Sequence, residues 1–182
     1  YRAGCNLADS VAALYAAIGV LAALHDRDIT GSGQELDISI CDCLMTFLLL
    51  WLPSYFINGK ASTRKGNRHL SSVPWNTYPA SDGTIMICTS TDQQWYRLAE
   101  LLGHPDLGLG SRFEHLPGRM NESELIDQLV TKWTKEHTVE ETVIAFEAIG
   151  IPVGRIASVS QVLASPQAQA RQSTIEVTDN CG

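Results

Sequence analysis

The chain has 182 residues, of which 45% are hydrophobic, so it can bury the core of one domain or of two small subdomains. Thirteen Lys and Arg residues stand against 20 Asp and Glu residues, which gives a formal net charge of −7. This balance disfavours binding to nucleic acid or to an anionic membrane, because both attract basic surfaces. We therefore expect no nucleic acid and no membrane among the partners.

Cysteine and histidine usage argues against disulfides and against a metal site. The five cysteines, Cys181 among them, are an odd number without a Cys-x-x-Cys pair, which favours reduced thiols. The five histidines are scattered without the spacing of metal ligands, so we predict no metal. No targeting segment is evident, and the longest apolar run, residues 11–24, falls short of the roughly 20 residues of a membrane-spanning helix. The expected location is cytoplasmic, or mitochondrial in a eukaryote.

The first 30 residues predict a buried helix. Asp9 and Ser10 precede an Ala- and Leu-rich run over residues 11–24, a pattern typical of an N-capped helix. The run is apolar on all sides, which indicates burial on most of them. The charged cluster over residues 25–28 is expected to end this helix.

The next 30 residues predict a turn, a strand and a second helix. The glycines within residues 30–33 indicate a tight turn, and the polar–apolar alternation over residues 34–40 predicts a strand. A second apolar stretch, residues 43–56, predicts a helix as far as Pro53. Helix, turn and strand in this order indicate part of an α/β fold.

A polar segment over residues 59–72 contains several basic residues and no acidic one, and it predicts a linker. Beyond it, strands over residues 75–78 and 84–88 are expected to form a hairpin around the turn at residues 81–83. Residues 150–154 are expected to be a connector. Helices are predicted over residues 92–102, 123–135, 139–149 and 158–163.

Asp9 is the candidate functional carboxylate, and two interpretations remain open. As an N-cap it would contribute about 1 kcal/mol to the helix. Alternatively, a carboxylate at the positive end of a buried helix stays ionised and can attack an activated acyl group, with backbone N–H groups stabilising the oxyanion. Spacing alone does not decide between the two. The dinucleotide and phosphate-loop motifs are not matched, because Gly31-Ser32-Gly33 lacks a third glycine and Gly59-Lys60 lacks the following Ser or Thr.

Three blocks of residues, in family order across nearly the whole chain, resemble the family III CoA-transferases, which include α-methylacyl-CoA racemase. The first block is Asp9 with its Ala-rich helix, Arg27 and Thr30-Gly31-Ser32-Gly33-Gln34; the second is Gly66-Asn67-Arg68-His69, Pro74-Trp75 and Asp82-Gly83; the third is Gly150-Ile151-Pro152-Val153 with Ser165-Pro166-Gln167.

The resemblance implies an α/β fold class with an α+β small domain, as the middle part of a two-domain CoA-transferase fold with an open sheet and helices. Residues 1–58 would belong to the large domain, 59–72 to a linker, 73–160 to the small domain, and 161–182 to a segment returning to the large domain. Family members are about twice as long and form interlocked homodimers. The chain alone is therefore expected to be inactive.

The resemblance also implies an activity and its residues. Asp9 matches the catalytic carboxylate, which forms a covalent aspartyl intermediate while CoA moves between an acyl-CoA and a carboxylic acid. The loop with Lys65, Gly66, Asn67 and His69 is the expected substrate-binding loop, although a solvated basic loop is the plain alternative. No bound cofactor is expected, since the CoA thioester is the substrate.

Two alternatives remain. A racemase of the same family would pair an Asp with a His located upstream of Tyr1. The second block resembles the transferase branch more, and the opening residues 1–4 resemble members acting on dicarboxylic acyl groups. From another class, the chain would be a non-catalytic scaffold module.

Overall fold

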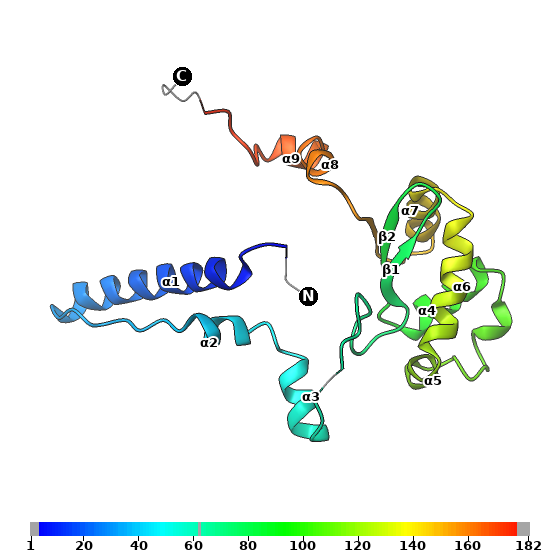
Figure 1. Ribbon diagram of the computed structural model, residues 1–182, viewed down its shortest axis with the longest axis horizontal. Coiled ribbons are helices and arrows are strands. Elements are labelled where there is room, and N and C mark those ends of the chain that lie inside the picture. Colours follow the sequence, from blue (N-terminus) through cyan, green and yellow to red (C-terminus); the bar gives the residue numbers. More distant parts are fainter. Residues whose placement is uncertain (1–3, 62, 178–182) are drawn as a thin grey trace. The chain divides into compact units, whose positions relative to one another are not determined.

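The computed structural model describes residues 4–61 and 63–177, and these form two compact units (Figure 1). The first unit is residues 1–64 and the second is residues 65–182. The division falls within the segment 59–72 that the sequence predicts as a linker. Cys181 and residues 178–182 of the predicted return segment lie outside the described residues.

The first unit contains α1 (Leu7–Thr30), α2 (Ile40–Met45) and α3 (Trp51–Asn58). The predicted end of α1 at the charged cluster 25–28 is wrong, because the helix continues to Thr30. It ends where Gly31 adopts a left-handed conformation, with φ 74°, and donates its N–H to the carbonyl of Arg27 at 2.8 Å. Charged side chains can face water on the last turn, so the glycine and not the charge sets the end.

The predicted burial of α1 on most sides is also wrong. Of its residues only Val11 and Ala12 are buried, and they pack with Cys43 of α2 and with Ile38. At 24 residues α1 is long and apolar enough, by length and composition, to cross a membrane. Core helices of globular proteins meet the same criteria, so the length of this helix does not decide its surroundings.

Two further predictions for the first unit are wrong. The predicted strand over residues 34–40 does not form: residues 32–39 have no regular secondary structure, and Ile40 already begins α2. A strand needs a neighbour for its backbone hydrogen bonds, and the described part of this unit contains none. Pro53 does not end a helix but lies in the first turn of α3, where a backbone N–H has no helical acceptor to lose.

The second unit is built on an antiparallel sheet of order β1-β2-β3, made of β1 (Trp75–Pro79), β2 (Thr84–Cys88) and β3 (Val153–Arg155). The predicted hairpin is confirmed, with Trp75 opposite Cys88 and Pro79 opposite Thr84. The prediction of a plain connector over residues 150–154 is wrong, because β3 pairs there with β2. A three-residue strand has too little alternation to be recognised without its partner.

Helices cover this sheet and their positions were largely predicted. α6 packs against β1, and α7 packs against β3. Capping boxes begin α4, α7 and α8, in which a Ser or Thr hydroxyl and a Gln or Glu three residues later satisfy the first backbone N–H groups. The helices are α4 (Asp92–Leu101), the 3₁₀ turn η1 (Pro105–Leu107), α5 (Leu116–Asn121), α6 (Ser123–Lys135), α7 (Val139–Ala148), α8 (Val159–Leu163) and α9 (Pro166–Ala170). Of these, η1, α5 and α9 were not predicted, because they are too short to show a helical period.

The core of the second unit lies between the sheet and the helices. Ile85 and Ile87 alternate along β2 and are fully buried, as are Trp95 of α4 and Phe146 of α7. Trp95 is held by a hydrogen bond from its indole N–H to the carbonyl of Leu107, at 2.8 Å. This core fixes the position of β1, to which the loop over residues 66–69 is hydrogen-bonded.

Gly118 tests the packing around α5. Alanine is usually preferred to glycine inside a helix by about 1 kcal/mol. Here, however, a Cβ at position 118 would overlap the backbone carbonyl oxygen of Arg112. We expect Gly118→Ala to lower the free energy of unfolding by about 2 kcal/mol in urea denaturation. Gly154→Ala, whose Cβ would meet open space, is the control and should change it by less than about 0.5 kcal/mol. Equal stability of the two variants would contradict the packing described.

Candidate functional site

Asp9 lies in the first turn of α1 with its carboxylate exposed. The interpretation of Asp9 as an N-cap is wrong, since Asn6 occupies the cap position. Asp9 is the third residue of the helix, so its own backbone is already helical. Within the described residues, no hydrogen bond or ion pair engages its side chain. An unengaged carboxylate therefore stands near the positive end of a long helix dipole.

The loop carrying Gly66, Asn67 and His69 lies in the second unit, before β1. Gly66 has a φ of 65°, a left-handed conformation that only glycine adopts without strain. The exposed Asn67 donates from its side-chain amide to the hydroxyl of Thr77 on β1, at 2.9 Å. The loop is thus tied to the sheet, while Gly66 and Asn67 remain exposed to solvent.

His69 is held by three interactions, two of them with Trp75 of β1 and one within the loop. Its ring stacks on the indole of Trp75, with the centroids 4.1 Å apart and the planes at 15°. Its backbone N–H donates to the carbonyl of Trp75 at 2.9 Å. The backbone N–H of Ser71 donates to Nδ1 at 3.3 Å, which assigns the proton of the neutral ring to Nε2. His69 can therefore present one N–H donor in a fixed orientation.

Between these residues, Arg68 pairs with Asp127 of α6. Nε and Nη2 of Arg68 lie 2.9 and 2.5 Å from Oδ2 of Asp127, and the two side chains are 24% and 13% exposed. Asp127 also accepts from the amide of Asn76, at 3.1 Å, and from the hydroxyl of Tyr78, at 2.5 Å. Burial, followed by the neighbouring Asp127 carboxylate, raises the pKa of Tyr78 above its usual range.

Sequence reasoning missed Asp127. It is 59 positions from Arg68, and no local pattern distinguishes it from a polar residue on the exposed side of α6. Asp9 belongs to the first unit and the loop to the second. Gly66, Asn67 and His69 therefore lie together in one loop, and Asp127 is bonded to Arg68 of that loop. Asp9 lies in the other unit.

A second ion pair, between the buried Arg119 and the partly exposed Asp92, joins α4 to α5. Nη2 of Arg119, whose side chain is 3% exposed, lies 2.6 Å from Oδ1 of Asp92. The other oxygen of Asp92 lies 3.1 Å from Nδ1 of His115. Arg119 also donates to the backbone carbonyls of Val73, Phe113 and Glu114. Each nitrogen of this buried guanidinium donates to a group inside the fold, so the cluster is structural.

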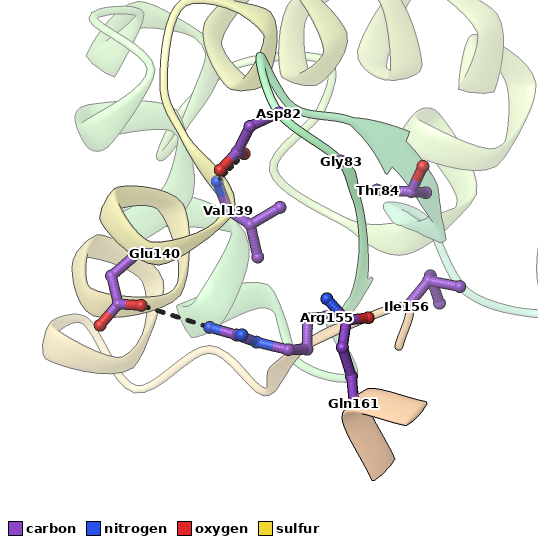
Figure 2. Close-up of a pocket in the computed structure, with 8 residues that line it drawn as sticks. All are labelled: Asp82, Gly83, Thr84, Val139, Glu140, Arg155, Ile156 and Gln161. Atoms are coloured by element: carbon purple, nitrogen blue, oxygen red, sulfur yellow. Dashed lines mark hydrogen bonds and ion pairs between the residues drawn. The ribbon is translucent and has the colours of Figure 1, made fainter. Parts of the chain in front are cut away.

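A small cavity of 160 Å³ lies at the turn between β1 and β2 (Figure 2). Asp82 accepts from the backbone N–H of Val139 at 2.7 Å, and Arg155 reaches Glu140 at 3.3 Å. The walls of this cavity contain none of the site residues predicted from the sequence. Among residues 4–61 and 63–177, no group of three His, Cys, Asp or Glu side chains is arranged to hold a metal ion.

The family model for CoA-transferase family III matches residues 1–181. The chain belongs to CoA-transferase family III.

Curated relatives agree with this assignment. A succinyl-CoA–D-citramalate CoA-transferase of Chloroflexus aurantiacus is 35% identical over 179 residues, which are 98% of this chain and 44% of that protein. An acetyl-CoA:oxalate CoA-transferase of Acetobacter aceti is 28% identical over 173 residues, or 95% and 44% of the two chains. The chain thus spans less than half the length of these relatives.

Solved structures share the fold. A CAIB/BAIF family protein from Brucella suis matches with a TM-score of 0.75 and 33% identity, covering 94% of this chain and 45% of that one. The Rv3272 protein of Mycobacterium tuberculosis matches with a TM-score of 0.78 at 23% identity, covering 98% and 47%. The predicted fold class, α/β with an α+β small domain as part of a CoA-transferase III fold with an open sheet and helices, is confirmed.

The Asp92–Arg119 pair predicts how stability depends on pH. The hydrogen bond from Arg119, followed by the one from His115, lowers the pKa of Asp92 in the folded state. Its stabilising contribution is therefore complete above the unfolded pKa of about 3.9 and is lost as pH falls through the lower folded value. We expect the difference in unfolding free energy between wild type and Asp92→Asn to shrink as pH falls from 6 to 3 in urea titrations at each pH. The exposed Asp106→Asn should show no such trend, and a difference that stays constant with pH would contradict the assignment.

Proposed function

We propose that this chain carries the catalytic carboxylate of a CoA-transferase, which moves CoA between an acyl-CoA and a carboxylic acid through a covalent aspartyl intermediate. The observation that carries the proposal is the exposed, unengaged Asp9 carboxylate in the first turn of α1, in a chain of a CoA-transferase family. A capping or ion-paired aspartate would already be committed to a structural partner. Asp9 has none among the described residues.

The first half-reaction would proceed in two steps. The Asp9 carboxylate attacks the thioester carbonyl of the donor, the C–S bond breaks, and a mixed anhydride and CoA thiolate form. The thiolate then attacks the aspartyl carbonyl of the anhydride and releases the donor's carboxylate. Asp9 is left as an aspartyl-CoA thioester, so the activation of the original thioester is retained at each step.

The second half-reaction would reverse this order with a different acid. The acceptor carboxylate attacks the aspartyl thioester and expels CoA thiolate, which forms a second mixed anhydride. The thiolate attacks the acceptor's acyl carbonyl, so a new acyl-CoA leaves and the Asp9 carboxylate is regenerated. The first backbone N–H groups of α1 have no intrahelical acceptors and favour negative charge at this end of the helix. They would stabilise the oxyanions of these steps.

Gly66, Asn67 and His69 would bind substrate in this scheme. The Nε2–H of His69 is an oriented donor for a carbonyl or carboxylate oxygen, and the side-chain oxygen of Asn67 remains as an acceptor after its amide bonds Thr77. Gly66 permits the turn that presents both side chains. The acids named for the relatives, D-citramalate and oxalate, are dicarboxylic. They support a dicarboxylic acid as one substrate of this protein.

The active protein would be a homodimer of a longer chain, with acyl-CoA and an acid acceptor as its small-molecule partners. It would require no bound cofactor, because CoA enters as a thioester substrate. Its location is proposed to be cytoplasmic, or mitochondrial in a eukaryote. No nucleic acid or membrane is proposed as a partner.

Trapping with hydroxylamine tests the role of Asp9. The full-length protein is incubated with an acyl-CoA, succinyl-CoA first, and hydroxylamine, which attacks an aspartyl anhydride or thioester to give a hydroxamate. Mass spectrometry of the digest should find the hydroxamate on Asp9 and lose it in Asp9→Asn. Asp42→Asn is the matched control, because Asp42 is also an exposed acid in the first turn of a helix of this unit. It should leave trapping unchanged.

The same samples distinguish the alternatives. Exchange of the acyl-CoA α-proton into deuterated water without a hydroxamate would replace the transferase by the racemase of the same family. Neither adduct nor exchange with several acyl-CoAs would favour a non-catalytic scaffold module.

The 182 residues alone should bind CoA poorly. The chain covers only 44% of its relatives' length, and we propose that most groups that bind CoA lie elsewhere in the full-length protein. Isothermal titration of the isolated chain with CoA should show no binding at micromolar concentrations, and the chain should have no transferase activity. A micromolar dissociation constant would contradict this proposal.

A further inference from the structure

We propose that Asp127 is a positioning residue for substrate binding, which fixes Arg68 and thereby the loop over residues 66–69. The inference rests on the proposed function, in which Gly66, Asn67 and His69 of this loop bind substrate. It adds a residue of α6 that sequence patterns do not connect to the loop.

The Asp127 carboxylate is saturated with donors from the loop and from β1. One oxygen accepts from Nε and Nη2 of Arg68 and from the amide of Asn76, while the other accepts from the hydroxyl of Tyr78. Hydrogen bonds between ionised groups are about twice as strong as neutral ones. Arg68 therefore has the strongest single attachment that the loop makes.

The platform beneath this carboxylate is rigid. Asp127 lies in the second turn of α6, between Ile126 and Val130, which are fully buried. The same helix packs against β1. A carboxylate on a helix anchored by these buried side chains, and bonded to two residues of the neighbouring strand, cannot follow the loop if the loop moves.

Pairing with Asp127 also determines which groups of the loop remain free. The guanidinium of Arg68 is neutralised and largely covered, so it is not the group that binds an anionic substrate. Asn67 and His69, on either side of it, are each tied to β1 by one side-chain interaction. Fixing the central residue removes backbone freedom from both neighbours before substrate arrives, and this lowers the entropic cost of binding.

Asp127→Asn tests the charge with little change of shape. The amide can still accept from Arg68 and Asn76 through its oxygen, but the ion pair is gone. Tyr78→Phe is the matched control, because it removes a hydrogen bond from the other oxygen of Asp127 and leaves Arg68 paired. A purely structural role of Asp127 would give the two variants the same effects.

Limited trypsin digestion of the full-length protein measures loop fixation directly. Cleavage after Arg68 should be about tenfold faster in Asp127→Asn than in wild type, because a loop released from the helix opens to the protease more often. Cleavage after the exposed neighbours Arg64 and Lys65 provides the internal reference. Tyr78→Phe should keep the wild-type rate at Arg68 relative to that reference.

Steady-state kinetics then measures the effect on substrate. Asp127→Asn should raise the KM for acyl-CoA or for the acid about tenfold, with kcat within about twofold of wild type, since the reacting carboxylate is untouched. Tyr78→Phe should leave both constants near wild type. Equal effects of the two variants, or unchanged tryptic rates and KM in Asp127→Asn, would overturn the inference.

Failure of the proposed function would be distinguished by hydroxylamine trapping in wild type. Without a hydroxamate at Asp9 the transferase scheme fails, and the substrate-binding part of the inference fails with it. With the hydroxamate present, the KM values decide the inference alone.

Discussion

The second unit depends on a carboxylate, that of Asp127, which is almost covered by protein and accepts four hydrogen bonds there. These bonds come from two places in the chain: Arg68 of the loop before β1, and Asn76 and Tyr78 of the strand itself. The bonds from Arg68 join the loop to the helix, and the bonds from Asn76 and Tyr78 join the strand to it, so loop, strand and helix retain one arrangement. The residues proposed to bind substrate lie on that loop. In this proposal the orientation of Asn67 and His69 depends on the carboxylate of Asp127 in α6.

The two units divide the proposed chemistry between them. The first supplies a reactive acid on an exposed helix with a small core of Val11, Ala12 and Cys43, while the second supplies a firmly packed sheet and helix layer. Catalysis needs an unengaged carboxylate, whereas binding needs fixed donors, and these requirements favour different surroundings. The chain corresponds to less than half the length of its relatives, so these two units are part of a longer fold in those proteins.

Local signals predicted what local forces determine. The hairpin around residues 81–83 and the helix over residues 123–135 have their turn residues and their periodicity in the sequence itself, and both formed as expected. The candidate carboxylate Asp9 was found through its neighbours along the chain, yet its capping role was wrong because Asn6 starts the helix. Burial of α1 and the strand over residues 34–40 depend on neighbours in space. Asp127 could not be predicted for the same reason, since an ion pair between residues 59 positions apart produces no periodic pattern in the sequence.

The pairing of β2 with β3 sets an order of events during synthesis. Ile85 and Ile87 emerge with the early hairpin, but their partners Arg155 and Val153 follow some 70 positions later. Until then one edge of β2 has unpaired backbone groups, and such edges are templates for wrong pairing with another chain. Closing a loop of this length costs entropy, which is repaid only after α4, α6 and α7 have compacted the intervening chain. The shortest strand, β3, is thus the last to join the sheet. Once it has paired with β2, that edge can no longer pair with another chain.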